Sequence, residues 1–194
     1  MFTSQRQLEI SNLRRLLLPA VTAAALVAGA SALWAQKSSS AAKFELTASS
    51  FTSGGNIPRQ FTCEGENISP ALAWTEPPPG TQSLVLIVDD PDAPSGTFVH
   101  WVVYNLPAAA RQLPDRIQGK DDLAGGGVQG RNDFGASGYG GPCPPPGKPH
   151  RYFFKLYALD SKLSLPPGSR KADVEEAMKG HVLAEARLMG RYRR

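Results

Sequence analysis

Two of the three histidines each follow a proline-rich turn. His100 comes after DDPDAPSGTFV, and His150 comes after GGPCPPPGKP. Proline presets φ and lacks a backbone N–H, so such turns hold a fixed shape. Imidazole groups on a rigid backbone can bind polar ligands or move protons. The pattern therefore indicates one small preformed site built around the two histidines.

The chemistry expected of this site is anion binding. The acidic run that contains Asp90 directly follows a continuous apolar segment. A carboxylate beside an imidazole fixes its tautomer and raises its pKa, which leaves an N–H donor pointing into the pocket. Turn amides and the Tyr152 hydroxyl would add donors suited to a phosphate or carboxylate group. The alternative for His100 and His150 is an ordinary core histidine with satisfied hydrogen bonds.

Catalysis by the same residues is a separate hypothesis. Asp90, His100 and His150 could hold a metal or support acid–base hydrolysis. The sequence contains neither an HExxH pattern nor a G-x-S-x-G nucleophile turn. We therefore predict that the protein is not an enzyme and that it uses no cofactor.

The elements expected to position the site are mostly strands. Short runs rich in β-branched and aromatic residues alternate with Pro- and Gly-rich breakers, which is typical of a β-sandwich or barrel. The run at 84–88 is wholly apolar, as in a strand covered on both faces. The other expected strands are 98–105, 151–159, 44–51 and 71–74, and helices are expected at 172–179 and 182–189.

Alternation along these strands predicts which side chains share a face. His150, Tyr152 and Phe154 are expected on one face of their strand. In the strand at 98–105, one face would carry Phe98, His100, Val102 and Tyr104, and the other Val99, Trp101 and Val103. The glycine-rich stretch at 119–141 is expected to be a functional loop beside the site, because long loops in compact domains usually carry function or are disordered.

The N-terminus resembles an export signal. Arg14 and Arg15 precede an apolar run that ends at Ala35. Residues 1–35 are predicted to be a signal peptide, with an uncleaved membrane anchor as the alternative, and 36–43 a polar linker. We expect one folded domain at 44–194 in a periplasmic or secreted protein, where Cys63 and Cys143 could form a disulfide worth on the order of 4 kcal/mol. Two buried thiols are the alternative.

The charge balance argues against nucleic acid as a partner. The formal net charge is +4, and the charged residues are scattered along the chain. A nucleic-acid-binding surface needs a concentrated basic patch. Membrane contact is expected only through the N-terminal segment or a bound head group.

Four segments together resemble the phosphatidylethanolamine-binding proteins, and most closely their bacterial Raf-kinase-inhibitor-like branch. They are FTCEGENISPALAW, DDPDAPSGTFVHWVVYNLP, GPCPPPGKPHRYFFKLYALD and AMKGHVLAEARLMGRY. The resemblance covers nearly all of 44–192. It implies a β-sandwich with a few short helices, mostly toward the C-terminus, and an anion pocket. Carried over by position, the ligand-binding residues are Asp90, Pro94, His100, Gly141, Pro142, Cys143, Pro144, Pro145, His150 and Tyr152.

The expected function is non-catalytic binding of a phosphate-type or phospholipid head group, with a protein partner as a further expectation. Fold alone does not transfer a relative's role. The alternative is an inhibitor of a protease or other enzyme, acting through a rigid proline loop. In that case exposed loop residues such as Lys148 would matter more than His100 or His150.

Overall fold

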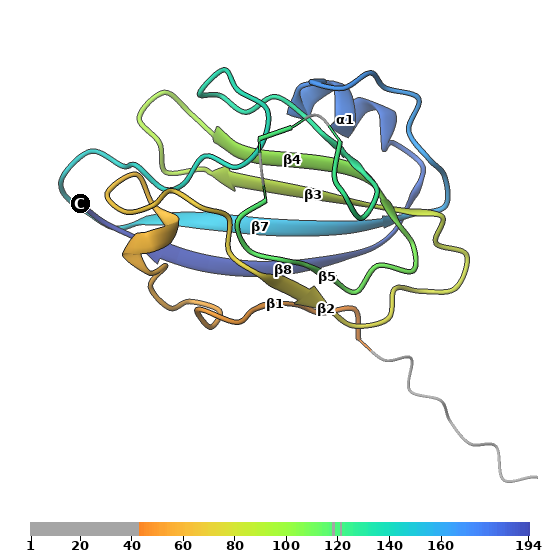
Figure 1. Cartoon of the computed structure of the whole chain (residues 1–194), viewed down its shortest axis with the longest axis horizontal. Coiled ribbons are helices and arrows are strands. Elements are labelled where there is room, and N and C mark those ends of the chain that lie inside the picture. Colours follow the sequence, from red (N-terminus) through yellow and green to blue (C-terminus); the bar gives the residue numbers. More distant parts are fainter. Residues whose placement is uncertain (1–42, 118, 121) are drawn as a thin grey trace, which may run out of the picture. The chain divides into compact units, whose positions relative to one another are not determined.

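The computed structural model describes residues 43–117, 119–120 and 122–194. This part of the chain forms two antiparallel sheets, one α-helix and one 3-10 turn (Figure 1). The predicted export segment and all of the linker except Lys43 lie outside the described residues. Within those residues, no helix is both long and apolar enough to cross a membrane. The mainly β fold predicted from the sequence is confirmed.

The larger sheet has five strands and carries the predicted site. Its three central strands agree with the sequence prediction to within two residues at each end. In spatial order the strands are β6 (Val128–Gln129), β4 (Phe98–Pro107), β3 (Ser83–Asp90), β7 (His150–Leu159) and β8 (Val182–Tyr192).

The smaller sheet has three short strands. Its order is β1 (Leu46–Ala48), β2 (Leu72–Trp74) and β5 (Gln112–Leu113), all antiparallel. The predicted strands at 44–51 and 71–74 contain β1 and β2. The two residues of β5 are too few to show a period in the sequence.

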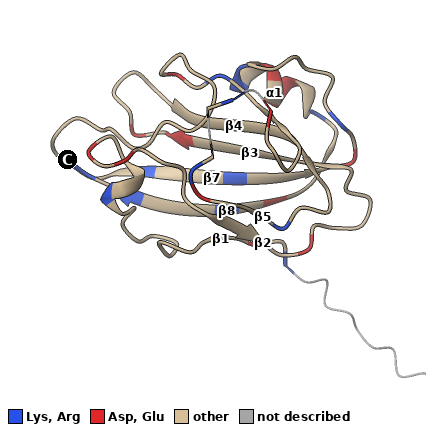
Figure 2. Ribbon diagram, in the orientation of Figure 1, with Lys and Arg blue, Asp and Glu red and all other residues tan. Residues whose placement is uncertain are grey.

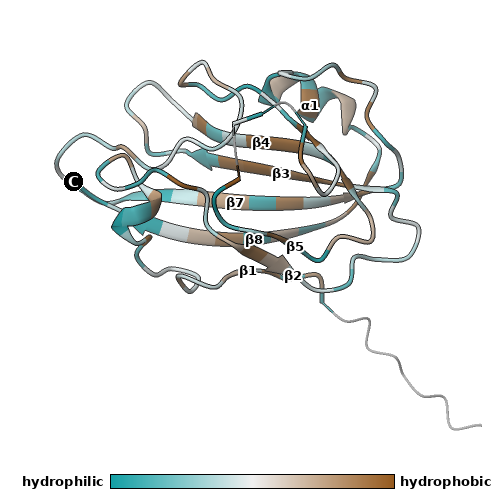
Figure 3. Ribbon diagram, in the orientation of Figure 1, coloured by the Kyte–Doolittle hydropathy of each residue, from teal (hydrophilic) through white to brown (hydrophobic). Residues whose placement is uncertain are grey.

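Apolar side chains from both sheets meet in a first core. Leu72 and Trp74 of β2 contribute from one side, and Leu86, Phe154 and Leu188 from the other. All eight residues of β3 are buried, as expected for a continuous apolar run with both faces covered. Figure 3 shows hydrophobic residues along much of β3 and β4.

A second core lies on the opposite face of the large sheet. Val85 and Ile87 of β3 pack there with Val174 and Met178, which belong to α1 (Lys171–Ala177) and the residue that ends it. Figure 1 shows α1 beside β4. Positively and negatively charged segments are interspersed along the ribbon, as the scattered charges of the sequence suggest (Figure 2).

The predicted helix at 182–189 is wrong, because these residues form β8. Ala186, Leu188 and Gly190 are buried, whereas Glu185 and Arg187 are exposed, which is the period of a strand. Ala, Glu, Arg and Leu favour helix locally, but pairing along β7 overrides that preference. The described residues therefore hold one α-helix near the C-terminus, rather than several.

Gly190 of β8 lies close against buried side chains of the first core. A Cβ built there would lie 2.5 Å from Ile57 Cγ1 and 2.9 Å from Phe51 Cε2. Both side chains are buried, so neither can move without disturbing the packing.

We expect Gly190→Ala to lower the free energy of unfolding by about 1–3 kcal/mol, the usual cost of overpacking a core. Gly125→Ala is the matched control, because a Cβ at Gly125 meets no atom within 4 Å. Urea denaturation of both variants measures the difference. Equal urea midpoints for the two variants would show that the side chains around Ile57 move to accommodate the added methyl group without loss of stability.

Candidate functional site

A β-bulge at the start of β4 sets the position of His100. Val88 of β3 pairs with Trp101, and the next residue, Asp89, pairs with Val99. His100 is therefore the extra residue of the bulge. A bulge bends its strand and re-aims the side chains beside it.

The bulge overturns the alternation predicted for β4. Val99 and Val102 both pack in the second core, whereas Trp101 packs in the first. The His100 ring centroid is 5.1 Å from that of Tyr152, which belongs to the first core. The prediction that His100 shares a face with Val102 is wrong, because the inserted residue shifts the period by one.

His150 meets the carboxylate that closes β3. Its Nδ1 lies 2.8 Å from Asp90 Oδ2, and Asp90 is buried. The other oxygen, Asp90 Oδ1, accepts the backbone N–H of Asp92 at 2.8 Å. With Nδ1 donating to a carboxylate, Nε2 is the His150 nitrogen left for a ligand. This is the carboxylate–imidazole contact expected from the sequence.

Arg151 clamps the acidic turn against the start of β7. Its Nε and Nη2 donate to the two oxygens of Asp92 at 2.8 and 2.6 Å, and its backbone N–H donates at 2.9 Å. The side-chain hydrogen bonds from Arg151 are the main cause that lowers the pKa of Asp92 to about 2. This clamp fixes the turn that carries Pro94.

His100 is held by a backbone carbonyl instead of a carboxylate. Its Nδ1 lies 2.6 Å from the oxygen of Gly140, and the Gly140 N–H donates to the His100 carbonyl at 2.9 Å. Because the carbonyl can only accept, Nδ1 carries the proton and Nε2 is an acceptor in the neutral ring. Burial lowers the pKa of His100 below its ordinary value. The expectation of a raised pKa is thus wrong for His100.

Tyr152 supplies a buried hydroxyl beside both histidines. The residue is 1% exposed, and within the described residues its Oη makes no hydrogen bond of regular geometry, although it interacts with the nearby Asp90 carboxylate. Burial, together with the nearby charge of Asp90, raises the pKa of Tyr152. A buried polar atom without a well-formed hydrogen bond costs stability, so its retention needs an explanation.

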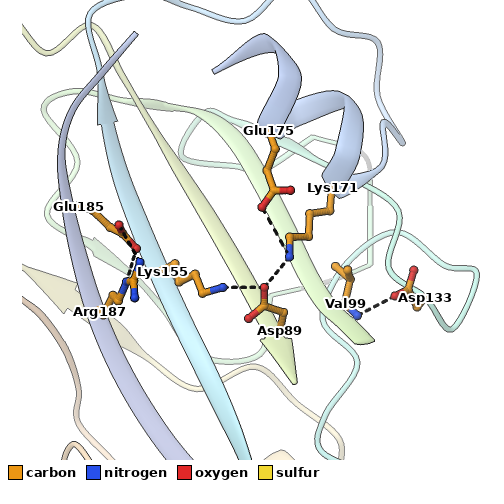
Figure 4. A network of polar contacts seen from close by, with 8 residues as sticks. All are labelled: Asp89, Val99, Asp133, Lys155, Lys171, Glu175, Glu185 and Arg187. Carbon is orange, nitrogen blue, oxygen red and sulfur yellow. Dashed lines mark hydrogen bonds and ion pairs between the residues drawn. The ribbon is translucent and has the colours of Figure 1, made fainter. Parts of the chain in front are cut away.

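The two adjacent aspartates of β3 serve opposite faces of the sheet. Asp89 lies on the face of α1, where its Oδ2 accepts from Lys155 at 2.8 Å and from Lys171 at 2.7 Å (Figure 4). Lys171 belongs to α1, so this buried ion cluster ties the helix to the end of the sheet. Asp90 faces His150 on the other side of the sheet.

The loop after β6 brings an aromatic side chain to the site. The backbone N–H of Val99 donates to Asp133 Oδ2 at 2.7 Å, and the Asp133 N–H donates to the Val99 carbonyl at 2.9 Å (Figure 4). The next residue, Phe134, is 51% exposed. Its ring centroid lies 4.8 Å from that of Phe98 and 5.5 Å from that of His100.

These groups surround a cavity of about 560 Å³, within the usual size range for small-ligand sites. Eight of the ten predicted site residues line it. The predicted residues in the wall are Asp90, Pro94, His100, Cys143, Pro144, Pro145, His150 and Tyr152, and the further residues are Ala93, Ser95, Gly96, Thr97, Phe98, Asp133 and Phe134.

Gly141 and Pro142, also predicted as ligand-binding, do not line the cavity. The Gly141 N–H donates to Asn67 Oδ1, and the Pro142 carbonyl accepts from Cys63 N–H. Both residues are turned toward the segment behind the wall. Phe134 escaped the sequence prediction because no motif marks it, although the glycine-rich loop in which it lies was expected beside the site.

The structure joins Cys63 and Cys143 in a disulfide bond with a Cα–Cα distance of 5.4 Å. The sequence left open whether these cysteines form a disulfide or remain two buried thiols, and the structure has the disulfide. Closing so long a loop limits the unfolded chain and contributes about 4–5 kcal/mol in the chain-entropy model. Because Cys143 lines the cavity, the bridge is also part of the site wall.

Other features outside the cavity carry less chemistry. A second, mostly apolar cavity of about 490 Å³ is bordered by Leu113, Ile117 and Leu123 and contains no histidine. Among the described residues, no group of three or more His, Cys, Asp or Glu side chains is arranged to hold a metal ion.

Comparison with a family model identifies the family to which the chain belongs. The model for phosphatidylethanolamine-binding proteins matches residues 47–193. The chain belongs to this family. The family match ends one residue before the last and covers every strand from β2 to β8.

Two curated relatives are similar to this chain over most of its length. A UPF0098 protein of Methanothermobacter thermautotrophicus is 55% identical over 144 residues, covering 74% of this chain and 95% of the relative. A UPF0098 protein of Aquifex aeolicus is 50% identical over 159 residues, covering 81% and 92%.

Solved structures show the same fold. CT736 of Chlamydia trachomatis, described as a homologue of phosphatidylethanolamine-binding protein, has a TM-score of 0.71 at 42% identity, covering 78% of this chain and 97% of its own. YbcL of E. coli, described as a new member of the mammalian family, has a TM-score of 0.73 at 39% identity, covering 79% and 99%.

The buried His100 makes stability depend on pH. Because burial lowers the pKa of His100 in the folded state, the unfolded chain takes up more protons as the pH falls below about 6.5. The stability due to neutral His100 is therefore present above that pH and is lost on acidification.

We expect the free energy of unfolding to fall between pH 7.5 and pH 5.5, and His100→Asn to reduce that fall. One group contributes at most about 1.4 kcal/mol per pH unit. Asparagine keeps an N–H donor for the Gly140 carbonyl but cannot titrate. Urea denaturation at the two pH values measures the change, and identical slopes for variant and parent would contradict the assignment.

Proposed function

We propose that the protein binds a small phosphate-type anion, such as a phosphorylated head group, in the cavity at the end of β3, β4 and β7. The observation that carries the proposal is the pair of imidazoles, His100 and His150, that line one cavity with each Nδ1 already hydrogen-bonded. Their Nε2 atoms are the ring nitrogens left for a ligand. Binding, rather than catalysis, is the role proposed for these groups.

The hydrogen bonds behind the imidazoles support this proposal. Asp90 and the Gly140 carbonyl each accept from an Nδ1 atom, so both rings are fixed in orientation before a ligand arrives. Fixed donors lose little entropy on binding. Protonated at Nε2, each ring would donate a charge-assisted hydrogen bond to a phosphate oxygen.

The carboxylates in the wall set a limit on affinity. Asp90 already accepts from His150 and from the Asp92 amide, and Asp133 accepts from the Val99 amide. These hydrogen bonds offset part of their repulsion toward an anion, but not all of it. The wall also offers apolar surface from Pro94, Phe98 and Phe134, which suits a ligand with an organic part beyond its anionic group.

Removing the His150 imidazole should weaken binding of O-phosphoethanolamine. Loss of one charge-assisted hydrogen bond corresponds to roughly a tenfold to hundredfold lower affinity. Isothermal titration calorimetry of His150→Ala against the parent measures this. His181→Ala is the control, because His181 is exposed, pairs with Asp160 and lies outside the cavity wall. Equal affinities for parent and His150→Ala would remove His150 from the binding role.

Anion binding should strengthen as the pH falls. Neutral His100 must take up a proton before its Nε2 can donate, and burial makes that uptake unfavourable near neutral pH. Sulfate is a suitable probe because its charge is constant between pH 5.5 and pH 7.5. We expect tighter sulfate binding at pH 5.5, and a smaller difference for His100→Asn. Weaker binding at the lower pH would contradict the proposed role of His100.

We further propose that the protein works in an oxidising compartment outside the cytoplasm. The disulfide between Cys63 and Cys143 supports this, because such bonds persist in exported proteins and are rare in the cytosol. The apolar run that ends at Ala35 supports it independently.

A further inference from the structure

One wall of the cavity has little hydrogen bonding of its own. Its residues Cys143, Pro144 and Pro145 belong to the segment 141–146, in which Pro142, Pro144, Pro145 and Pro146 have no backbone N–H. No strand includes this segment. Its position must therefore be set by contacts with another part of the chain.

Those contacts come from the turn at 61–67. The Cys63 N–H donates to the Pro142 carbonyl at 3.1 Å, and the Gly141 N–H donates to Asn67 Oδ1 at 2.7 Å. The disulfide joins Cys63 directly to Cys143, a residue of the cavity wall. Within seven residues, the turn thus holds Cys143 of the wall and the two residues that precede it, Gly141 and Pro142.

The two segments lie in close backbone contact. A Cβ on Gly141 would lie 2.3 Å from the Phe61 carbonyl oxygen and 2.6 Å from Asn67 Oδ1. The same Phe61 carbonyl accepts from the hydroxyl of Tyr139 at 2.8 Å. Asn67 itself has a φ of 57°, a left-handed conformation that asparagine tolerates better than most residues. This conformation of the turn places the side-chain oxygen of Asn67 where it accepts the Gly141 N–H.

We propose that Cys63 and Asn67 are positioning residues for the binding cavity, and that ligand affinity depends on the redox state of the Cys63–Cys143 bond. The inference rests on the proposed anion-binding function. Neither Cys63 nor Asn67 lines the cavity, so each acts through the wall segment. Only the oxidised protein holds Cys143 and its proline neighbours in the binding geometry.

The redox step needs an external dithiol. A thiolate of dithiothreitol attacks one sulfur of the disulfide, and the mixed disulfide closes to the cyclic form of the reagent. Two electrons and two protons pass to the protein, which gains the Cys63 and Cys143 thiols. Removal of the bridge leaves the wall attached by hydrogen bonds alone.

The first test measures binding of O-phosphoethanolamine by calorimetry to oxidised parent, to parent reduced with dithiothreitol, and to Cys63→Ala. We expect roughly five- to tenfold weaker binding after reduction, since a misplaced wall loses the equivalent of one hydrogen bond. Cys63→Ala keeps Cys143 in the wall, so it should match the reduced parent with or without dithiothreitol.

The second test needs no ligand. Amide hydrogen exchange, followed by NMR, reports the Gly141 and Cys63 N–H groups that join the two segments. We expect both to exchange at least several-fold faster in reduced protein, while amides of the buried strand residues Leu86 and Leu156 remain among the slowest to exchange. The strand amides show that the fold persists.

The outcomes separate the two proposals. Equal affinity of oxidised and reduced parent would overturn the redox inference and leave the anion-binding function standing. Absence of binding by oxidised parent would overturn both. Unchanged exchange at Gly141 and Cys63 after reduction would overturn the positioning role, whatever the binding data show.

Discussion

The shape of the cavity at the end of the large sheet depends on one inserted residue. Without the bulge at His100, strict alternation would turn that imidazole toward the second core, away from Tyr152. Two hydrogen bonds with Gly140 hold the inserted residue. The Gly140 N–H donates to the His100 carbonyl, and the His100 ring donates to the Gly140 carbonyl. The loop of Asp133 is hydrogen-bonded to Val99, the residue before His100. The loops around the cavity are thus attached at the point where the strand departs from regular pairing.

The site retains polar groups at a cost to the fold. His100 is buried and, within the part of the chain that the structure describes, the Tyr152 hydroxyl makes no hydrogen bond of regular geometry, although the same volume could hold apolar side chains. Buried polar groups without full hydrogen bonding usually destabilise a protein and recur where a ligand completes them. Because the proline-rich turns around the cavity are rigid, the backbone cannot easily move to give these polar groups new hydrogen-bond partners. These features distinguish the cavity from the two apolar cores of the fold.

Much of the fold could be predicted because its central strands are marked by continuous apolar runs and strong breakers. The apolar run at 84–88 is typical of a strand covered on both faces, and the structure buries all of β3. β8 was missed because its residues prefer helix locally, and only the pairing with β7 makes them a strand. The short β5 and β6 carry too few residues to show any period.

The site was predicted in part for similar reasons. Residues in rigid motifs, such as Asp90 and His150, lie where the motifs place them. The bulge at His100 could not be seen, because one extra residue leaves no mark on composition. Phe134 lies in a glycine-rich loop whose path is fixed by tertiary hydrogen bonds, so its contribution needed coordinates.

The neighbouring carboxylates at the end of β3 restrict how this protein can change its length. Asp89 belongs to the ion cluster under α1, and Asp90 belongs to the ligand cavity. Deleting or inserting a single residue earlier in the strand would turn each carboxylate to the opposite face of the sheet. Side chains around them can be substituted without moving either acid, but a change in strand length by one residue needs a compensating bulge like the one at His100.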